Sequence, residues 1–280
     1  MGRRTSSLSS RRLLLAAALF LAVLPGQAQQ EPKGIQDNSF LIEEAYNQEK
    51  GVIQHISGFS RLWPSRDWGY SFTEEWPVPG HEKHQLSATI NLVSPGDSST
   101  GMGDCFFNYR YQLVGNGEAR VAVAPRLSLL LPTGSASQGR GFGGPGLQIS
   151  LPASVVVVDR HLVTHWNAGA TFVPSARGAG TDRAAVIGYN LGQSVVWLAH
   201  PRFNVLLETV WNASQAVAGP DTTVAVRSLL LNPGMRWAYN FKNGLQIVPG
   251  VGVPIGVGPS AGEKGIFLYL SFEHPLGAAR

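Results

Sequence analysis

The stretch "GDCFFNYRYQL", residues 103–113, decides the fold because its side chains alternate strictly between two kinds. Such alternation predicts a β-strand with two unlike faces. In a soluble sandwich the aromatic face would be buried, whereas in a membrane barrel it would meet lipid and the polar face would line the lumen. The first face carries Cys105, Phe107, Tyr109, Tyr111 and Leu113, and the second carries Asp104, Phe106, Asn108, Arg110 and Gln112.

The rest of the chain favours the membrane barrel. Charged residues make up only 14% of the sequence, against about 25% in ordinary soluble domains. About twelve short alternating runs follow one another from residue 51 onward, separated by clusters of Gly, Pro, Asn, Asp and Ser. We therefore expect an all-β fold, a transmembrane antiparallel β-barrel of about twelve strands over residues 51–275. The first run, residues 52–60, alternates poorly.

The lengths of the links between the expected strands point the same way. The odd-numbered links span roughly 7, 10, 14, 12, 15 and 7 residues and the even-numbered ones roughly 8, 7, 6, 5 and 5. Long loops on one side and short turns on the other are typical of bacterial outer-membrane barrels with periplasmic termini. Hydrocarbon offers no water to unpaired backbone groups, so the sheet has to close on itself.

The N-terminus has the pattern of a secretory signal peptide, assigned to residues 1–28. Four arginines precede an apolar run over residues 13–24, which is followed by "PGQAQQ". The run is too short for a spanning helix, which needs about 20 residues. Removing the signal takes four of the 22 basic residues, which leaves 18 against 18 acidic residues. The mature chain is therefore near neutral, and its charge gives no indication of nucleic-acid binding.

No motif indicates a catalytic residue, a metal or a cofactor. "GRGFGG" has the spacing of a dinucleotide loop but is followed by Pro145 and a further strand, so an external loop is expected. "GPSAG" has the spacing of a nucleophile elbow around Ser260 but lies between two strands. His81 and His84 fall in a short turn with no partner ligands nearby. The single cysteine, Cys105, excludes an intrachain disulfide.

Strand parity selects a set of side chains for the lumen. The structural interpretation is that these charges pair with one another and fill a narrow barrel, and the functional one is that they form a constriction that selects solutes. The lumen candidates are Asp104, Asn108, Arg110, Arg126, His165, Glu208 and Arg236.

Residues 29–50 form a segment before the first strand, either periplasmic or luminal. Asp37 and its neighbours are good helix N-caps, and apolar residues then recur at helical spacing, which predicts a short helix. The inward arginines outnumber the inward acids, so the segment could fold back and plug the barrel mouth through Glu43, Glu44 and Glu49. A disordered periplasmic lead-in is the alternative.

Several stretches together resemble the outer-membrane proteins associated with the meta-cleavage pathway of phenol degradation. They include "IQDNSFLIEEAYNQEKGVIQHI", "PRLSLLLPTG", "FNVLLETVW" and "LNPGMRWAYNFKNGLQIVPGVGVPIG", and the resemblance runs over residues 35–275. It implies a transporter-like barrel without catalytic residues. The last strand is also similar to a signal for the barrel-assembly machinery, with a C-terminal tail, residues 276–280, beyond it.

The functional expectation is an outer-membrane barrel for passive passage of small hydrophobic or aromatic compounds, with the lipid bilayer as its main partner and the solute unknown. One alternative is a structural or adhesive barrel whose filled lumen transports nothing. A second is a barrel lipid hydrolase with a Ser-His pair exposed to lipid, although His165 points inward by parity. A third is a soluble secreted sandwich with its aromatic faces buried.

Overall fold

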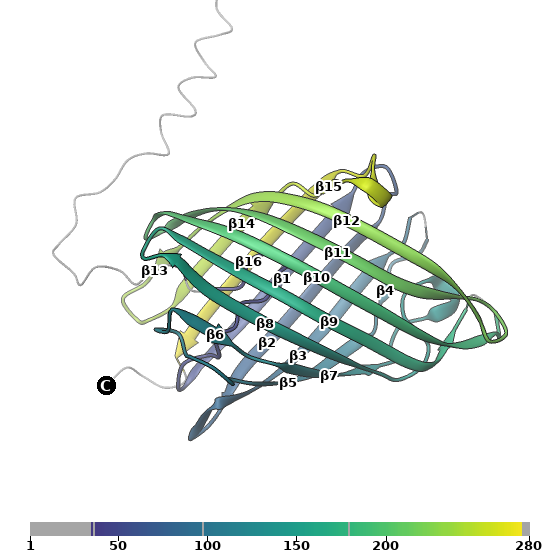
Figure 1. The fold of residues 1–280 in the computed structure, drawn as a ribbon, viewed down its shortest axis with the longest axis horizontal. Helices are drawn as coiled ribbons and strands as arrows, with labels where there is room; N and C mark the ends of the chain where they lie inside the picture. Colours follow the sequence, from purple (N-terminus) through teal and green to yellow (C-terminus); the bar gives the residue numbers. More distant parts are fainter. Residues whose placement is uncertain (1–34, 36, 97, 179, 276–280) are drawn as a thin grey trace, which may run out of the picture. The chain divides into compact units, whose positions relative to one another are not determined.

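The computed structural model describes residue 35 and residues 37–96, 98–178 and 180–275. The predicted signal peptide, residues 1–28, and the tail, residues 276–280, lie outside this part of the chain. Within the described residues the strands form one antiparallel sheet that closes into a twelve-stranded barrel (Figure 1). The expected fold class is confirmed. No described helix is long and apolar enough to cross a membrane.

The barrel wall consists of β1 (Val52–Leu62), β2 (Trp68–Val78), β3 (His81–Ser94), β5 (Cys105–Tyr111), β7 (Arg126–Leu131), β8 (Gly146–Val158), β9 (Leu162–Arg177), β10 (Arg183–His200), β11 (Phe203–Gly219), β12 (Thr222–Trp237), β14 (Gln246–Gly252) and β16 (Gly265–Pro275). Shorter elements lie between them: β4 (Gly101–Met102), β6 (Val121–Val123), β13 (Tyr239–Asn240), β15 (Ile255–Gly256) and the 3₁₀ turns η2 (Ala136–Gln138) and η3 (Gly258–Ser260).

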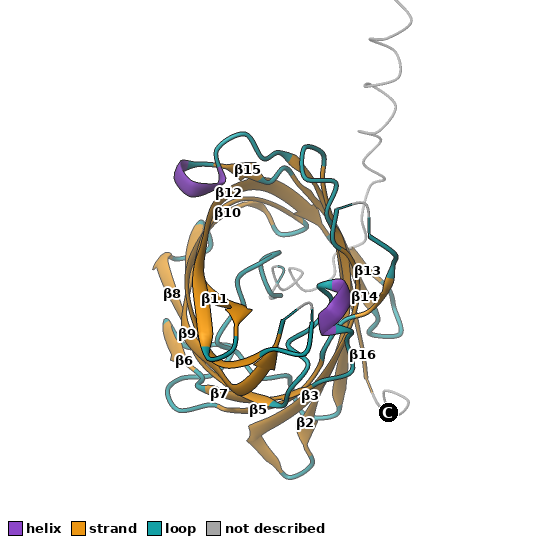
Figure 2. Cartoon of the chain, turned by 90° about the vertical axis from the view of Figure 1, so that its right-hand side faces the viewer, coloured by secondary structure: helices purple, strands orange, loops and turns teal. Residues whose placement is uncertain are grey.

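The first and last strands close the wall. β1 pairs with β16 along its whole length, from Val52 opposite Pro275 to Leu62 opposite Gly265. β1 alternates poorly in sequence because its inward face carries Gly58, which packs against Phe267, and apolar Ile56 beside the buried luminal cluster. The strand with the weakest alternation is therefore one of the two strands that close the barrel. Seen end-on, the strands form a ring around an interior (Figure 2).

The two faces of β5 separate as the alternation predicts. Phe107 is 43% exposed on the outer face, whereas Asn108 and Arg110 are each 2% exposed. On the neighbouring strands, Leu129 pairs with Phe107 and Leu147 with Leu129, which extends the exposed apolar belt. An exposed belt of apolar side chains around polar, buried inner residues is the pattern of a barrel whose outer solvent is lipid.

Two of the expected long links are wrong. β9 and β10 are joined only by residues 178–182, and β11 and β12 only by Pro220 and Asp221. The polar residues assigned to these loops instead continue the strands, because β9 to β12 stay paired well beyond the ends of their neighbours. The loops over residues 95–104, 132–145 and 253–264 remain long and lie at the same end of the barrel. The expected "GRGFGG" loop belongs to the second of these.

The helix predicted before the first strand is also wrong over the residues that the structure describes. Residues 37–49 contain bends and irregular backbone but no helical turn. The fifth expected strand is interrupted as well. Pro125 lacks a backbone N–H, and it separates β6 from β7.

An outward arginine tests the assignment of the two faces. Leu129→Arg places a charge on the exposed belt and should destabilise the inserted barrel by roughly 2–4 kcal/mol if it lies near the bilayer midplane. Gln148→Arg, on the inner side of the adjacent strand β8, is the control and should cost less. Urea titration of refolding into lipid vesicles measures both variants, and equal losses of stability would contradict the assignment.

Candidate functional site

Residues 37–48, hereafter the luminal segment, run through the barrel interior (Figure 2). Eight of the backbone N–H groups between residues 40 and 48 donate to side-chain oxygens, and seven of these eight N–H groups donate to oxygens of the wall. Side-chain acceptors take the place that helical carbonyls would fill, and this explains why the segment is not a helix. The wall acceptors are Glu208, Asn167, Ser154, Gln112 and Gln85.

Glu208 on β11 forms the tightest anchor of the segment. Its Oε1 atom accepts hydrogen bonds from three consecutive backbone N–H groups, those of Phe40 at 2.9 Å, Leu41 at 2.8 Å and Ile42 at 3.1 Å. Its Oε2 atom accepts from Asn232 at 2.7 Å. Converging backbone N–H groups form an anion-binding concavity, and here the anion is a fully buried carboxylate of the wall.

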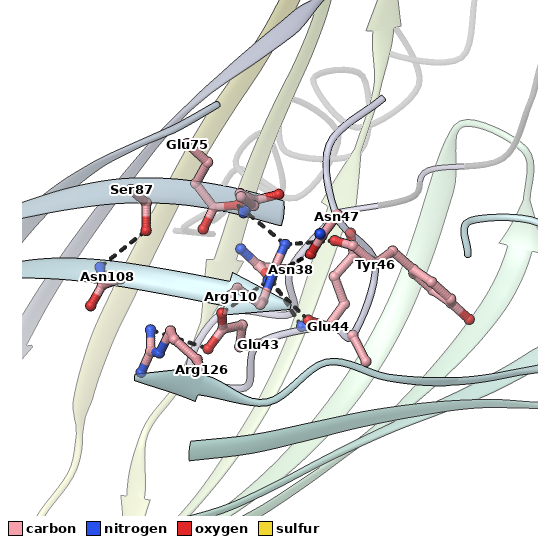
Figure 3. Close-up of polar contacts among 12 residues, drawn as sticks. Asn38, Glu43, Glu44, Tyr46, Asn47, Glu75, Ser87, Asn108, Arg110 and Arg126 are labelled. Carbon is pink, nitrogen blue, oxygen red and sulfur yellow. Dashed lines mark hydrogen bonds and ion pairs between the residues drawn. The ribbon is translucent and has the colours of Figure 1, made fainter. Parts of the chain in front are cut away.

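A second anchor is a charge cluster of Glu43, Glu75, Arg110 and Arg126 (Figure 3). Glu43 bridges two strands, with one oxygen 2.9 Å from Nη1 of Arg110 and the other 3.1 Å from Nη1 of Arg126. Glu75 on β2 lies 3.6 Å from Nη2 of Arg110. The cluster contains two acids and two arginines, so the segment supplies the acid that balances the wall.

Arg110 also binds the backbone of the luminal segment. Its guanidinium donates to the carbonyl oxygens of Glu44 at 3.3 Å and Tyr46 at 2.6 Å, and to the side chain of Asn47 at 3.0 Å. A buried guanidinium is costly unless its donors are occupied. With these contacts and Glu43, most of the donors of Arg110 are paired by one short stretch of chain.

A third anchor holds the start of the segment against the closing strands. Asp37 is buried, and its carboxylate accepts from Gln54 on β1 at 2.7 Å and from Tyr269 on β16 at 2.7 Å, and also from Ser271. Arg236 on β12 donates to the carbonyl oxygen of Asp37 at 2.9 Å and to that of Asn38. The carboxylate therefore joins the first and the last strand of the barrel.

Apolar side chains of the segment fit where the wall has glycine. A Cβ atom at Gly234 or Gly250 would collide with the ring of Phe40, and one at Gly192 would collide with Ile42. Bare backbone at these positions lets the segment pack directly on the sheet.

The luminal segment separates two cavities. One, of about 580 Å³, lies toward the end with the long loops and has Leu41, Ile42 and Glu43 at its boundary. The other, of about 490 Å³, lies toward the opposite end and is bounded by Glu44 and Tyr46. Its further lining includes Glu49, Glu82, Glu118, Glu273 and Lys83.

Two of the lumen candidates from the sequence, Asp104 and Asn108, bond to residues outside the luminal segment. Asp104 accepts from the backbone N–H groups of Gly134 at 3.0 Å and Phe142 at 2.7 Å, so it holds the loop over residues 132–145. Asn108 donates to Ser87 at 3.0 Å. The structure brings together Arg110, Arg126 and Glu43 of the sequence candidates, whereas Glu208 and Arg236 meet the segment through its backbone.

The two other acidic plug candidates are placed differently from Glu43, because Glu44 is buried and Glu49 is exposed. Burial raises the pKa of the Glu44 carboxyl well above its usual range, and the nearby charge of Asp37 adds to this effect. Glu44 meets Arg110 through its backbone carbonyl oxygen. Glu49 accepts from the backbone N–H of Val52 through its carbonyl oxygen at 3.0 Å, and its side chain is exposed.

His165, the last lumen candidate, forms the Ser-His pair that a hydrolase would need, but inside the barrel. Nδ1 of His165 lies 2.7 Å from the hydroxyl of Ser154, and both residues are buried. The Ser154 oxygen also accepts from the backbone N–H of Ala45. Ser260 on η3 accepts from Leu229, as expected of a loop residue. Among the described residues no cluster of His, Cys, Asp and Glu could hold a metal.

Sequence reasoning missed several contacts that hold the segment. Gln85, Gln112 and Asn167 had the right parity on their strands, but uncharged amides give no signal that they face a backbone. The sequence around Asp37 indicates only a helix cap. Its role depends on Tyr269 and Ser271, far away in sequence, so only the closed barrel reveals it.

Comparisons with known proteins agree with the fold. No family model and no curated protein matches the chain. Among solved structures, an outer-membrane channel from Pseudomonas putida F1 superposes with a TM-score of 0.54 at 15% identity, covering 82% of this chain and 97% of that one. The NanC porin superposes with a TM-score of 0.53 at 8% identity, covering 79% of this chain and all of the porin.

These likenesses show the fold and no more. The chain has the closed, twelve-stranded β-barrel fold of outer-membrane proteins.

Removing the charge of the first anchor should loosen the segment. Glu208→Gln replaces a carboxylate that accepts three backbone hydrogen bonds, and hydrogen bonds to charged groups contribute about 1.5–3 kcal/mol each. Hydrogen exchange at Phe40, Leu41 and Ile42 should accelerate at least tenfold in the purified barrel. Glu74→Gln, the same change on the exposed outer face of β2, should leave exchange unchanged. Protection retained in Glu208→Gln would refute the anchoring role.

Proposed function

We propose that this barrel is a passive outer-membrane channel for small hydrophobic or aromatic compounds, and that the luminal segment closes it in the conformation described. The observation that carries the proposal is the pair of cavities on either side of the segment. A cavity lies on each side, and one stretch of chain without regular structure separates the two cavities. Wall side chains hold that stretch through hydrogen bonds and ion pairs, which can exchange for water.

The lining of the larger cavity supports the class of solute. Its charged lining residues are Glu43, Glu75 and Arg126, which belong to the paired charge cluster. The rest of the lining mixes amides and hydroxyls with apolar side chains such as Phe106 and Phe142. A concave site with apolar surface and a few polar groups is typical of sites for small organic molecules. The arrangement favours compounds that carry a substantial apolar surface.

We also propose that the chain belongs to the family that its sequence resembles. The stretches quoted from the sequence resemble outer-membrane proteins associated with the meta-cleavage pathway of phenol degradation, and one of those stretches contains the whole luminal segment. That resemblance implies a transporter-like barrel, which agrees with the proposed channel.

A structural barrel without transport is the second candidate, and one observation favours it. The luminal segment satisfies buried groups of the wall, including Glu208 and Arg110, so a permanently filled lumen would be stable. Catalysis has less support. We infer that the Ser154–His165 pair is structural, because it is buried beside Ala45 rather than exposed to lipid.

Deletion of the luminal segment distinguishes a channel from a filled barrel. A variant that lacks residues 29–48 should show a several-fold higher single-channel conductance in planar bilayers than the full chain, because the two cavities become continuous. Heat-modifiable gel mobility checks that the deleted barrel still folds. Unchanged conductance in a correctly folded deletion variant would favour the structural barrel.

A charge reversal gives a milder test with the chain intact. Glu43→Lys removes the acid shared by Arg110 and Arg126 and adds a third positive charge between them. Because like charges in a buried site repel, the segment should leave and the open fraction in bilayer recordings should rise. Glu49→Lys, at an exposed position of the same acidic stretch, is the control and should have a smaller effect.

A further inference from the structure

The ring of Phe40 occupies a pocket that is shaped for an aromatic group. Its centroid lies 5.6 Å from that of Phe267 and 5.3 Å from that of Tyr269, both within the range of aromatic pairs. The floor consists of Gly234 and Gly250, where any side chain would collide with the ring. We call this site the Phe40 pocket. Its walls come from β12, β14 and β16, so the pocket remains if the luminal segment leaves.

A cation borders the pocket. Arg236 is 1% exposed, and its Cβ atom lies beside Gly250 at the pocket floor. Its Nη1 atom donates to the carbonyl oxygens of Asp37 and Asn38, two and three residues before Phe40. Its Nε atom is buried and has no hydrogen-bond partner in the structure. An unpaired buried donor is costly, and it marks a site where a ligand acceptor would be stabilised.

The luminal segment thus presents an aromatic ring together with oxygen acceptors for a guanidinium. An aromatic carboxylate carries the same two features in one small molecule. Its ring would fill the space of the Phe40 side chain, and its carboxylate would replace the two carbonyl oxygens. A carboxylate can also engage Nε and Nη of an arginine together, as a bidentate pair. Departure of the segment leaves Arg236 without its carbonyl acceptors, so an anion would then bind to Arg236 more tightly.

We propose that the Phe40 pocket is a binding site for a monocyclic aromatic carboxylate, and that Phe40 is its built-in occupant. Solute and segment compete for the pocket, so a bound solute shifts the barrel toward the state without the segment. The inference rests on the proposed function, because it supposes that the luminal segment leaves its place. It adds to that function a site at which a solute would release the segment.

Binding of benzoate to the purified full-length barrel in detergent tests the proposal. In Phe40→Ala no ring has to be displaced, so benzoate should bind at least tenfold more tightly than to the wild type in calorimetric titrations. Acetate, which lacks the ring, and benzylammonium, which inverts the charge, should bind neither protein measurably. Heat-modifiable gel mobility verifies that each variant is folded.

A second variant tests whether the binding is at this pocket. Gly250→Val in the Phe40→Ala background refills the pocket from its floor and should remove the gained affinity. Equal affinities of wild type and Phe40→Ala would overturn the proposal, as would affinity that survives the refilling.

Conductance separates this outcome from the proposed function. If the deletion variant conducts but Phe40→Ala gains no benzoate affinity, the channel stands and the pocket fails. If Phe40→Ala gains benzoate affinity but the deletion variant does not conduct, the pocket stands and the channel fails.

Discussion

The structure depends on one constraint, the need of every backbone N–H and C=O group in hydrocarbon to find a partner within the sheet. Only a closed wall satisfies this need, and the pairing of β1 with β16 provides the closure. Closure also buries inward side chains such as Arg110 and Glu208. Each charge that strand parity sends inward then has to be neutralised inside, because desolvation of an isolated ion costs several kcal/mol.

The luminal segment meets this second requirement. The wall contains two kinds of buried group that need hydrogen-bond partners, carboxylate acceptors such as Glu208 and guanidinium donors such as Arg110 and Arg236. An irregular backbone answers both, since its N–H groups and carbonyl oxygens are not committed to a helix or a sheet. Side-chain hydrogen bonds and ion pairs hold the segment, whereas continuous strand pairing holds the wall. Wall and segment are therefore held by different kinds of contact.

Much of the wall could be predicted from the sequence. Alternation in residues 103–113 assigns its two faces, and it works because a strand has a side-chain period of two whatever its surroundings. Link lengths were harder to predict, because strands β9 to β12 continue where their residues are already polar. The predicted helix failed for a different reason. Its capping and periodicity were local, whereas Glu208 and Asn167 compete for the same N–H groups from more than a hundred residues away. No single-sequence pattern reveals which strand carries that acceptor.

The carboxylate of Asp37 has a consequence for how the molecule is made. It accepts hydrogen bonds simultaneously from Gln54 on the first strand and from Tyr269 and Ser271 on the last strand. Contacts between the two ends of a chain carry the largest loop-closure entropy. Asp37 can gather all its partners only after the final strand has joined the first in the correct register. The buried aspartate thus couples the position of the luminal segment to completion of the wall in one register.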